Sequence, residues 1–304
     1  MALRLETPSP HSMSSLAAPS LDTKIVGLRN LLADLHRVVV CFSGGVDSGY
    51  LLAEAVGTLG RARTYALTAV SPSLAPQERS DAAEIAKQLG AQHLLVDTHE
   101  LDDARYAANP VNRCYFCKTE VYSTAVDEAH RLGLKHVLDG FNIDDRGDYR
   151  PGRRAAREQG VRSPLDELDF TKTDIREAAR RLELPLWDKP ALACLSSRFP
   201  YGVPITPDRL ERVAMCERTL RDLGFRVCRV RFYDAMARIE VELAELPRLR
   251  TPSVRTTILR KFLDAGFETV TVDPGGYQSG ALNESIARPG SSPTAPGSTS
   301  GIPL

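Results

Sequence analysis

The sequence predicts an α/β protein: a doubly wound parallel sheet, followed by a second, smaller α+β domain. Three observations predict this fold. Short apolar, β-branched runs alternate with segments of helical periodicity, a glycine turn directly follows the first of those runs, and the pattern changes near residue 205. Such alternation is typical of βαβ units, whose parallel strands are buried on both faces. Ligands of these sheets bind beyond the carboxyl ends of the strands.

The first domain is expected at residues 23–204, after a disordered tail at residues 1–22 that shows no continuous apolar core of a signal peptide. Apolar residues recur at helical spacing over residues 24–35, and residues 38–42 (VVVCF) form the first strand-like run. After a helical segment at residues 49–59 the alternation continues. Strands are predicted at residues 64–70, 93–97 and 136–141, and helices at residues 77–90 and 118–133.

The second domain is expected at residues 205–285, after the proline-rich stretch FPYGVPITP. Its predicted elements are a helix at residues 207–223, strands at 226–232 and 237–243, a helix at 253–265 and a strand at 269–272. Residues 286–304 are rich in proline, glycine and serine, so they are predicted to be disordered.

Charge and cysteine content exclude several classes of function. Lysine and arginine number 39, as do aspartate and glutamate, so no global basic field favours DNA or an anionic membrane as a partner. No apolar run approaches the roughly 20 residues that span a bilayer. Six cysteines in 304 residues are too sparse for a secreted disulfide scaffold. These observations favour a cytoplasmic protein.

The glycine turn, SGGVDS at residues 43–48, lies between a strand-like run and a helix. Glycines let the backbone approach a ligand, and the free amides at a helix start bind anions. The loop lacks the GK[ST] ending of a Walker A loop. The structural alternative is an ordinary turn in which Asp47 or Ser48 caps the helix. We favour phosphate binding by Ser43, Gly44, Gly45, Asp47 and Ser48, with Asp47 also a candidate ligand for magnesium.

Cys114 and Cys117 form a C-x-x-C pair. From spacing alone the pair fits a metal site, a redox pair or two buried small hydrophobic residues. Without a second pair it is weak evidence for zinc. Three other cysteines lie within strand or helix patterns and are interpreted as core residues or incidental: Cys41, Cys216 and Cys228.

SGGVDS resembles the pyrophosphate loop (PP-loop) of the ATP pyrophosphatase superfamily, whose members adenylate a carbonyl or carboxyl oxygen and release pyrophosphate. Longer motifs resemble one family, the pyridinium-3,5-biscarboxylic acid mononucleotide sulfurtransferases (LarE), which help to make the nickel-pincer cofactor of lactate racemase. These motifs are TAVSPS (68–73), NPVNRCYFCK (109–118), DGFNIDDRGDYRPG (139–152), GVRSPL (160–165), WDKPALACLSSRFPYG (187–202), RVRFYDAMARIEV (229–241) and GGYQSGALNE (275–284). They occur in order over residues 24–284.

The resemblance implies an adenine nucleotide alpha-hydrolase-like domain with ATP and magnesium as cofactors. It also implies an adenylating sulfurtransferase that converts the substrate's carboxylates to thiocarboxylates. Members with three cysteines at the positions of Cys114, Cys117 and Cys194 bind a 4Fe–4S cluster, whose open iron carries sulfide from a sulfur donor. Members with only the cysteine at the Cys194 position sacrifice its sulfur and end as dehydroalanine. With all three present here, the resemblance favours the cluster.

Arginines are expected to bind the phosphate and carboxylates of the substrate. Arg229 and Arg231 alternate with Val230 on a predicted strand, so both would face one side. Arg198, near Cys194, is a further candidate for substrate binding and catalysis. The alternative for the RVR run is a solvated strand face. The sequence departs from the family at Gln278, where an arginine is usual, and at Phe232–Tyr233, where a histidine-containing step is typical.

Two other classes of function compete with this interpretation. A PP-loop tRNA thiolase would use the same loop, but the small second domain shows no evident basic stripe. A non-enzymatic ATP-binding or sensor protein would leave the three cysteines without a role. We further expect a homo-oligomer, with the second domain serving in substrate binding or oligomerisation.

Overall fold

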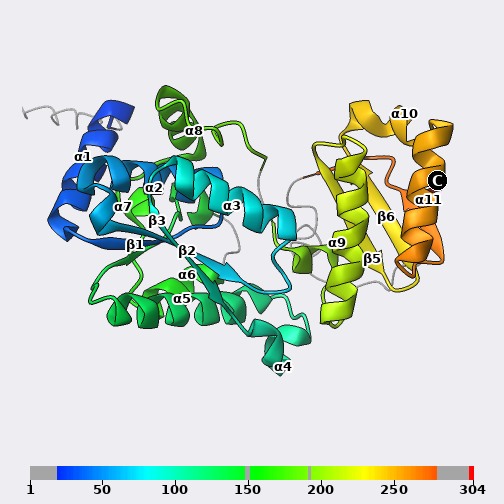
Figure 1. The fold of residues 1–304 in the computed structure, drawn as a ribbon, viewed down its shortest axis with the longest axis horizontal. Coiled ribbons are helices and arrows are strands. Elements are labelled where there is room, and N and C mark those ends of the chain that lie inside the picture. The colour runs from blue at the N-terminus through cyan, green and yellow to red at the C-terminus, as the bar shows by residue number, and fades with distance from the viewer. Residues whose placement is uncertain (1–18, 148–150, 191–192, 279–300) are drawn as a thin grey trace, which may run out of the picture.

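The computed structural model describes residues 19–147, 151–190, 193–278 and 301–304. It forms two units, which lie next to each other in Figure 1. The parts of the expected tails at residues 1–18 and 286–300 lie outside the described residues.

The first unit is built on a four-stranded parallel sheet in the order β3-β2-β1-β4. The strands are β1 (Val38–Cys41), β2 (Thr64–Val70), β3 (Gln92–Asp97) and β4 (Val137–Leu138). The chain moves outward from β1 through β2 to β3 and returns to β4 on the other side of β1. The order therefore reverses between β1 and β4, and this switch point is where a doubly wound sheet binds ligands.

Helices cover both faces of this sheet, as the predicted fold class requires (Figure 1). They are α1 (Leu21–Leu35), α2 (Val46–Leu59), α3 (Pro76–Gln88), α4 (Ala104–Ala107), α5 (Arg113–Arg131), α6 (Gly152–Glu158), α7 (Pro164–Glu167) and α8 (Lys172–Arg181). Val38 and Val40 pack with α1, α2, α3 and α8, whereas Val39 packs with α5 and α6. Successive side chains of β1 thus enter opposite layers, which explains its unbroken run of valines.

The second unit is a smaller α+β fold with a four-stranded sheet in the order β5-β6-β7-β8. Its elements are α9 (Pro207–Asp222), β5 (Cys228–Tyr233), β6 (Met236–Val241), α10 (Leu246–Leu249), α11 (Pro252–Asp264), β7 (Thr269–Val272) and β8 (Ile302–Pro303). β6 pairs antiparallel with β5 and parallel with β7. The core of this unit also includes Ala75, Tyr106, Leu195 and Phe199, all from before residue 205.

Both expected tails are shorter in the structure than the sequence predicts. α1 begins at Leu21 because the Ser20 side chain accepts a hydrogen bond from the Thr23 amide (3.2 Å) and caps the helix. At the other end, the prediction of disorder is wrong for residues 301–304. Ile302–Pro303 pairs with β7, and Leu304 packs against the second core. The open edge of β7 offers backbone partners that composition alone does not reveal.

Candidate active site

The SGGVDS loop joins β1 to α2 at the switch point of the parallel sheet. Gly44 has a φ of 76°, a left-handed conformation that favours glycine. Gly45 is the N-cap residue and provides no side-chain cap, while Asp47 and Ser48 already belong to the first turn of α2. The alternative in which Asp47 or Ser48 caps the helix is therefore wrong. The amides at the start of α2 have no capping side chain, which is the arrangement that binds phosphate.

The two serines of the loop face one another. The Ser48 hydroxyl lies 3.2 Å from the Ser43 hydroxyl and accepts a hydrogen bond from the Ser43 amide at 3.3 Å. Their hydroxyl groups therefore share one side of the loop, as the phosphate-binding interpretation requires.

Gly140 is a part of this site that residue-by-residue sequence reasoning missed. It follows β4, and a Cβ atom at this position would lie 2.7 Å from the Ser48 nitrogen. The neighbouring Asp139 is buried and accepts hydrogen bonds from the Tyr122 hydroxyl (2.8 Å) and the Ser163 hydroxyl (2.6 Å). Burial raises the pKa of Asp139 in spite of these hydrogen bonds. The signal in the sequence was the DGFN stretch at a predicted strand end.

The C-x-x-C pair lies on α5, which begins at Arg113 and not at residue 118 as expected. Cys114 and Cys117 are therefore three residues apart on one helical face. Cys114 is exposed, whereas Cys117 and Cys194 are partly buried. Burial raises the pKa of Cys117 well above its ordinary value, and the charges of Glu100, Cys194 and Cys114 raise it further. The three cysteines thus lie within electrostatic reach of one another.

The three thiols do not form a preassembled metal site. Within the described ranges, no group of three or more histidine, cysteine, aspartate or glutamate side chains is arranged to hold a metal ion. A 4Fe–4S cluster has the right donor type here, because thiolates are its usual ligands. In the structure, Cys114 and Cys194 are near enough to Cys117 to affect its pKa, but the three thiols are not arranged around a common metal position.

Glu100 helps to hold the polypeptide around Cys194, a role that sequence reasoning missed. Its buried carboxylate accepts hydrogen bonds from the hydroxyls of Ser71 (2.5 Å), Ser73 (2.9 Å) and Thr98 (2.9 Å). The Ser73 carbonyl in turn accepts the amide of Leu195 at 2.9 Å. The residue next to Cys194 is therefore held by loops at the carboxyl ends of β2 and β3.

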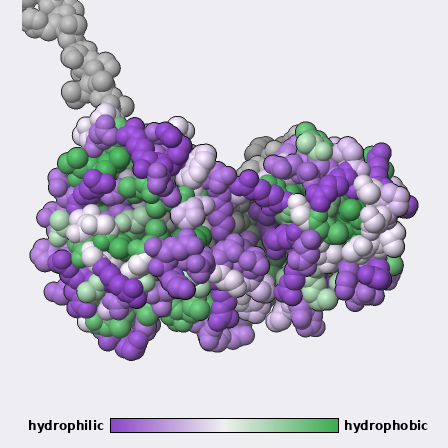
Figure 2. Space-filling view, turned by 45° about the horizontal axis from the view of Figure 1, so that its top comes forward, coloured by the Kyte–Doolittle hydropathy of each residue, from purple (hydrophilic) through white to green (hydrophobic). Residues whose placement is uncertain are grey.

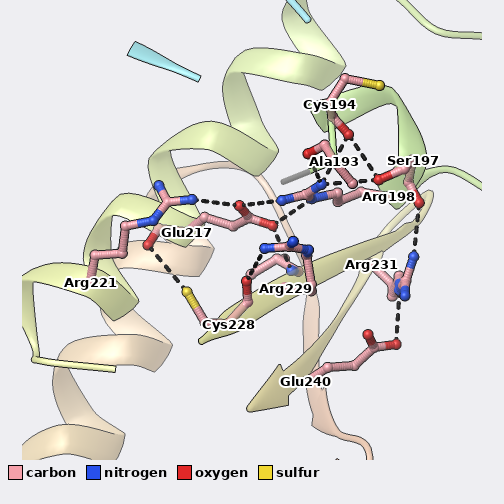
Figure 3. A network of polar contacts seen from close by, with 11 residues as sticks. Ala193, Cys194, Ser197, Arg198, Glu217, Arg221, Cys228, Arg229, Arg231 and Glu240 are labelled. Carbon is pink, nitrogen blue, oxygen red and sulfur yellow. Dashed lines mark hydrogen bonds and ion pairs between the residues drawn. The ribbon is translucent and has the colours of Figure 1, made fainter. Parts of the chain in front are cut away.

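Arg198 lies in the interior, with its side chain 0% exposed. Its Nε and Nη2 donate to the two carboxylate oxygens of Glu217 on α9, at 2.8 and 3.0 Å. Its Nη1 donates to the carbonyls of Ala193 (2.5 Å) and Cys194 (2.9 Å). The Cys194 carbonyl points toward the guanidinium and its thiol points away (Figure 3). In this structure Arg198 therefore holds the Cys194 turn, and it presents no exposed surface to a substrate.

Arg229 and Arg231 share one face of β5, opposite Val230, as their alternation predicts. Each is 9% exposed, so the alternative of a solvated strand face is wrong. Arg231 donates to Glu240 on β6 (2.8 Å) and to the Ser197 carbonyl (2.8 Å). Arg229 lies over the Tyr277 ring, and its pKa is lowered by burial and by the charge of Arg198. Both arginines thus belong to the network around the Cys194 turn (Figure 3).

Helix α3 connects the loop to this network. A Cβ atom at Gly44 would lie 3.3 Å from the Cβ of Ala82 on α3. One turn earlier, the buried Glu78 has a pKa that burial raises and that the positive charges of Arg198 and Arg221 lower in part. One turn of helix spans only about 5.4 Å. Helix α3 therefore contacts the SGGVDS loop at Ala82 and, one turn earlier, carries a carboxylate that feels the charges of the arginine network.

A parallel sheet with an uncapped glycine-rich loop at its switch point defines an α/β nucleotide-binding domain of the PP-loop class. In agreement, residues 28–128 match the family model described as asparagine synthase. The chain is 39% identical over 269 residues to the pyridinium-3,5-bisthiocarboxylic acid mononucleotide synthase of Lactiplantibacillus plantarum, an alignment that covers 88% of this chain and 97% of that protein. The chain belongs to this family, LarE, which confirms the resemblance of its motifs.

Two further relatives match this chain over different lengths. An uncharacterised protein of Synechocystis is 45% identical over 268 residues, which cover 88% of this chain and 100% of that protein. A tRNA-specific 2-thiouridylase of Beijerinckia indica is 27% identical over 194 residues, which cover 51% of this chain and 44% of that protein. The likeness to the tRNA enzyme is thus limited to about half of each chain.

No helix in the described part of the chain is long and apolar enough to cross a membrane. On the face drawn in Figure 2, hydrophobic side chains are interspersed with hydrophilic ones on both units.

We predict that Gly140→Ala weakens ATP binding strongly while the protein stays folded. The added methyl group would press on the Ser48 backbone, which cannot yield without moving the start of α2. The measurement is ATP affinity by calorimetry beside a thermal melt. Gly147→Ala is the control, because a Cβ atom there meets no heavy atom within 4 Å. Equal ATP affinity for both variants would contradict the prediction.

We predict that Glu217→Gln lowers the free energy of unfolding at pH 7 by about 3–5 kcal/mol, because it leaves the buried Arg198 without a counter-charge. Burial alone would raise the pKa of Glu217, but Arg198 together with the charges of Arg229 and Arg221 holds the pKa below the ordinary 4.5. The wild-type advantage should therefore be full above about pH 4.5 and shrink as the pH falls further. Urea unfolding at several pH values measures it.

The control for this prediction is Glu128→Gln. That residue forms an exposed i,i+3 pair with Arg131, which is expected to contribute less than about 1 kcal/mol. A Glu217→Gln protein as stable as this control, or a difference from wild type that does not change with pH, would contradict the assignment.

Proposed function

We propose that this protein is an ATP-dependent sulfurtransferase that converts the carboxylates of pyridinium-3,5-biscarboxylic acid mononucleotide to thiocarboxylates. The Lactiplantibacillus plantarum relative is named for synthesis of the matching bisthiocarboxylic acid mononucleotide. One structural observation supports the proposal most. Helix α3 borders both the glycine-rich loop, which it contacts at Ala82, and the arginine network of the Cys194 turn, whose charges act on Glu78 one turn earlier. A nucleotide on the loop would thus lie beside the candidate sulfur donor.

The first half-reaction in this proposal is adenylation. A substrate carboxylate oxygen attacks the α-phosphorus of ATP, the bond to the bridging oxygen breaks, and pyrophosphate leaves with the electron pair. The amides at the start of α2 and the hydroxyls of Ser43 and Ser48 would bind phosphate oxygens, and Asp47 would hold magnesium. Adenylation is needed because a carboxylate oxygen is a very poor leaving group, whereas AMP leaves readily.

The second half-reaction is attack of sulfur on the acyl carbon, with release of AMP. The sulfur would come from the site around Cys194. In the proposed cluster form, Cys114, Cys117 and Cys194 hold a 4Fe–4S cluster, which leaves one iron open to an exogenous sulfide. The structure itself carries the donor set for such a cluster but no preassembled three-thiol site among the described residues. The alternative is sacrificial donation of the Cys194 sulfur.

Arg229 and Arg231 are the proposed contacts for the anionic groups of the substrate. Both are already near the Cys194 turn, and Arg231 is linked to it through the Ser197 carbonyl. Arg198 is proposed to act on sulfur transfer through the position of Cys194, since its own donors are directed at Glu217 and at main-chain carbonyls. Gln278 is exposed and lies where the family usually has an arginine.

The proposed activity predicts substrate-dependent pyrophosphate release, which Asp47→Ala abolishes because it removes the magnesium ligand without changing core packing. Pyrophosphate and AMP are measured with the pyridinium dicarboxylate nucleotide and, separately, with tRNA. Asp34→Ala, an exposed position on α1, is the control. Release with tRNA alone would favour a tRNA thiolase, and release with neither substrate would overturn the proposal.

The cluster form predicts that Cys114→Ala, Cys117→Ala and Cys194→Ala lose iron and sulfur transfer in parallel, while adenylation persists at the separate loop. Iron and sulfide are measured after anaerobic purification, together with intact mass after turnover. Cys216→Ala, a buried position far along α9, controls for loss of a thiol. In the sacrificial form only Cys194→Ala is inactive, and the wild type loses the mass of one hydrogen sulfide molecule per transfer. That result would contradict the cluster.

A further inference from the structure

We infer that Lys189 is a catalytic phosphate-binding residue of this nucleotide site, which reaches the SGGVDS loop from 145 residues further along the chain. The inference rests on the proposed ATP chemistry and extends it to a cation that the loop itself lacks. SGGVDS contains no lysine or arginine, so its amides and hydroxyls provide dipoles but no positive charge. Beside the magnesium proposed at Asp47, positive charge from the protein itself must therefore come from elsewhere in the fold.

The Lys189 ammonium lies directly on the loop. Its Nζ donates a hydrogen bond to the Gly44 carbonyl at 3.2 Å and lies 3.5 Å from a carboxylate oxygen of Asp81 on α3. The lysine side chain is 18% exposed and that of Asp81 is 38% exposed. The ammonium is thus held against the loop at Gly44, the residue that precedes the N-cap of α2.

The backbone of Lys189 is fixed, so this placement is a property of the fold. Its amide donates to the Leu186 carbonyl at 3.0 Å, and its own carbonyl accepts Nη2 of Arg176 at 2.9 Å. The same guanidinium donates through Nη1 to the carbonyl of Trp187, also at 2.9 Å. Leu186 packs so closely on Gly49 of α2 that a Cβ atom there would lie 2.5 Å from it. The start of α2 and the lysine are therefore parts of one packed unit.

The present partners of Lys189 balance its charge only in part. A main-chain carbonyl carries no formal charge, and the contact to Asp81 is at the limit of hydrogen-bonding distance. Phosphate oxygens would give shorter, charge-assisted hydrogen bonds in place of these two contacts. A lysine ammonium suits this role because it acts as a compact point charge for phosphate.

Adenylation makes this charge catalytically useful. As the bond from the α-phosphorus to the bridging oxygen breaks, negative charge accumulates on the departing pyrophosphate. A fixed ammonium at the loop stabilises that charge as it develops, without reorganisation of solvent. The alternative is that Lys189 only fastens its own segment to Gly44.

The test compares Lys189→Met with Lys189→Arg in the full-length protein. Binding of ATP, pyrophosphate and AMP is measured by calorimetry with magnesium present, beside the rate of substrate-dependent pyrophosphate release. We expect Lys189→Met to weaken ATP and pyrophosphate binding by about tenfold or more, as loss of one charge-assisted contact predicts. AMP affinity should stay within about twofold, the maximal rate of release should fall, and Lys189→Arg should restore part of both losses.

Lys135→Met is the matched control, because Lys135 is exposed and precedes β4 at the amino-terminal end of the sheet. It should change none of these quantities. Equal losses for ATP and AMP together with a lowered melting temperature would show that Lys189 only fastens its segment, and unchanged ATP binding would also overturn the inference. Absence of ATP binding and of pyrophosphate release in the wild type would instead overturn the proposed function.

Discussion

The buried ion pair between Arg198 and Glu217 is the interaction on which the geometry of the candidate site depends. Glu217 accepts hydrogen bonds from Nε and Nη2 of the guanidinium and also from the main-chain amide of Val230 at 3.1 Å. One carboxylate thus joins the Cys194 turn, helix α9 and strand β5. Removing two charges from water is costly, and the surrounding hydrogen bonds offset that cost only because nearly every donor has an acceptor. Such a pair tolerates little change in geometry, and this gives the turn a defined position.

Two further constraints place the nucleotide loop against this turn. Gly140 allows the end of β4 to touch the start of α2, and Gly44 allows α3 to approach the loop within van der Waals distance. Because α3 is a single rigid helix, its packing at Ala82 also determines where Glu78 meets the arginine network. The second unit therefore contributes its arginines to the candidate site, and the first unit contributes the loop and α3. Neither unit alone contains the complete candidate site.

The sequence predicted most of the fold because its signals were local. The bounds of β2 and β7 agree with the predicted residues 64–70 and 269–272, since β-branched runs between glycine, proline and charged residues need little tertiary information. The start of α5 was missed because NRCYFCK shows no clear apolar periodicity, and its N-cap residue Asn112 makes no side-chain capping hydrogen bond. The strand at Ile302–Pro303 was missed because it pairs with the edge of β7, which is distant in the sequence.

The sequence predicted individual residues of the candidate site, but not the contacts between residues that are distant in the chain. The loop residues and the shared face of Arg229 and Arg231 follow from local spacing. The burial of Arg198 depends on Glu217, and the position of Lys189 depends on a loop 145 residues away. Side-chain type alone cannot show whether an arginine meets a ligand or a carboxylate of its own chain. The roles of Glu100, Gly140 and Lys189 become visible only when strands from distant parts of the sequence lie side by side.

The way in which Cys194 is held has a consequence for the lifetime of the protein. Its contacts with Arg198 and Ser197 are made by its main-chain carbonyl, and its neighbour Leu195 is held through an amide. The side chain contributes nothing to this anchoring, so oxidation, alkylation or removal of the sulfur would leave the anchor of the turn in place. A molecule that has lost its thiol would therefore keep the main-chain contacts that hold the turn. Damaged and intact copies would therefore be indistinguishable by stability. A cell that makes this protein would need to detect the modified side chain at residue 194 itself.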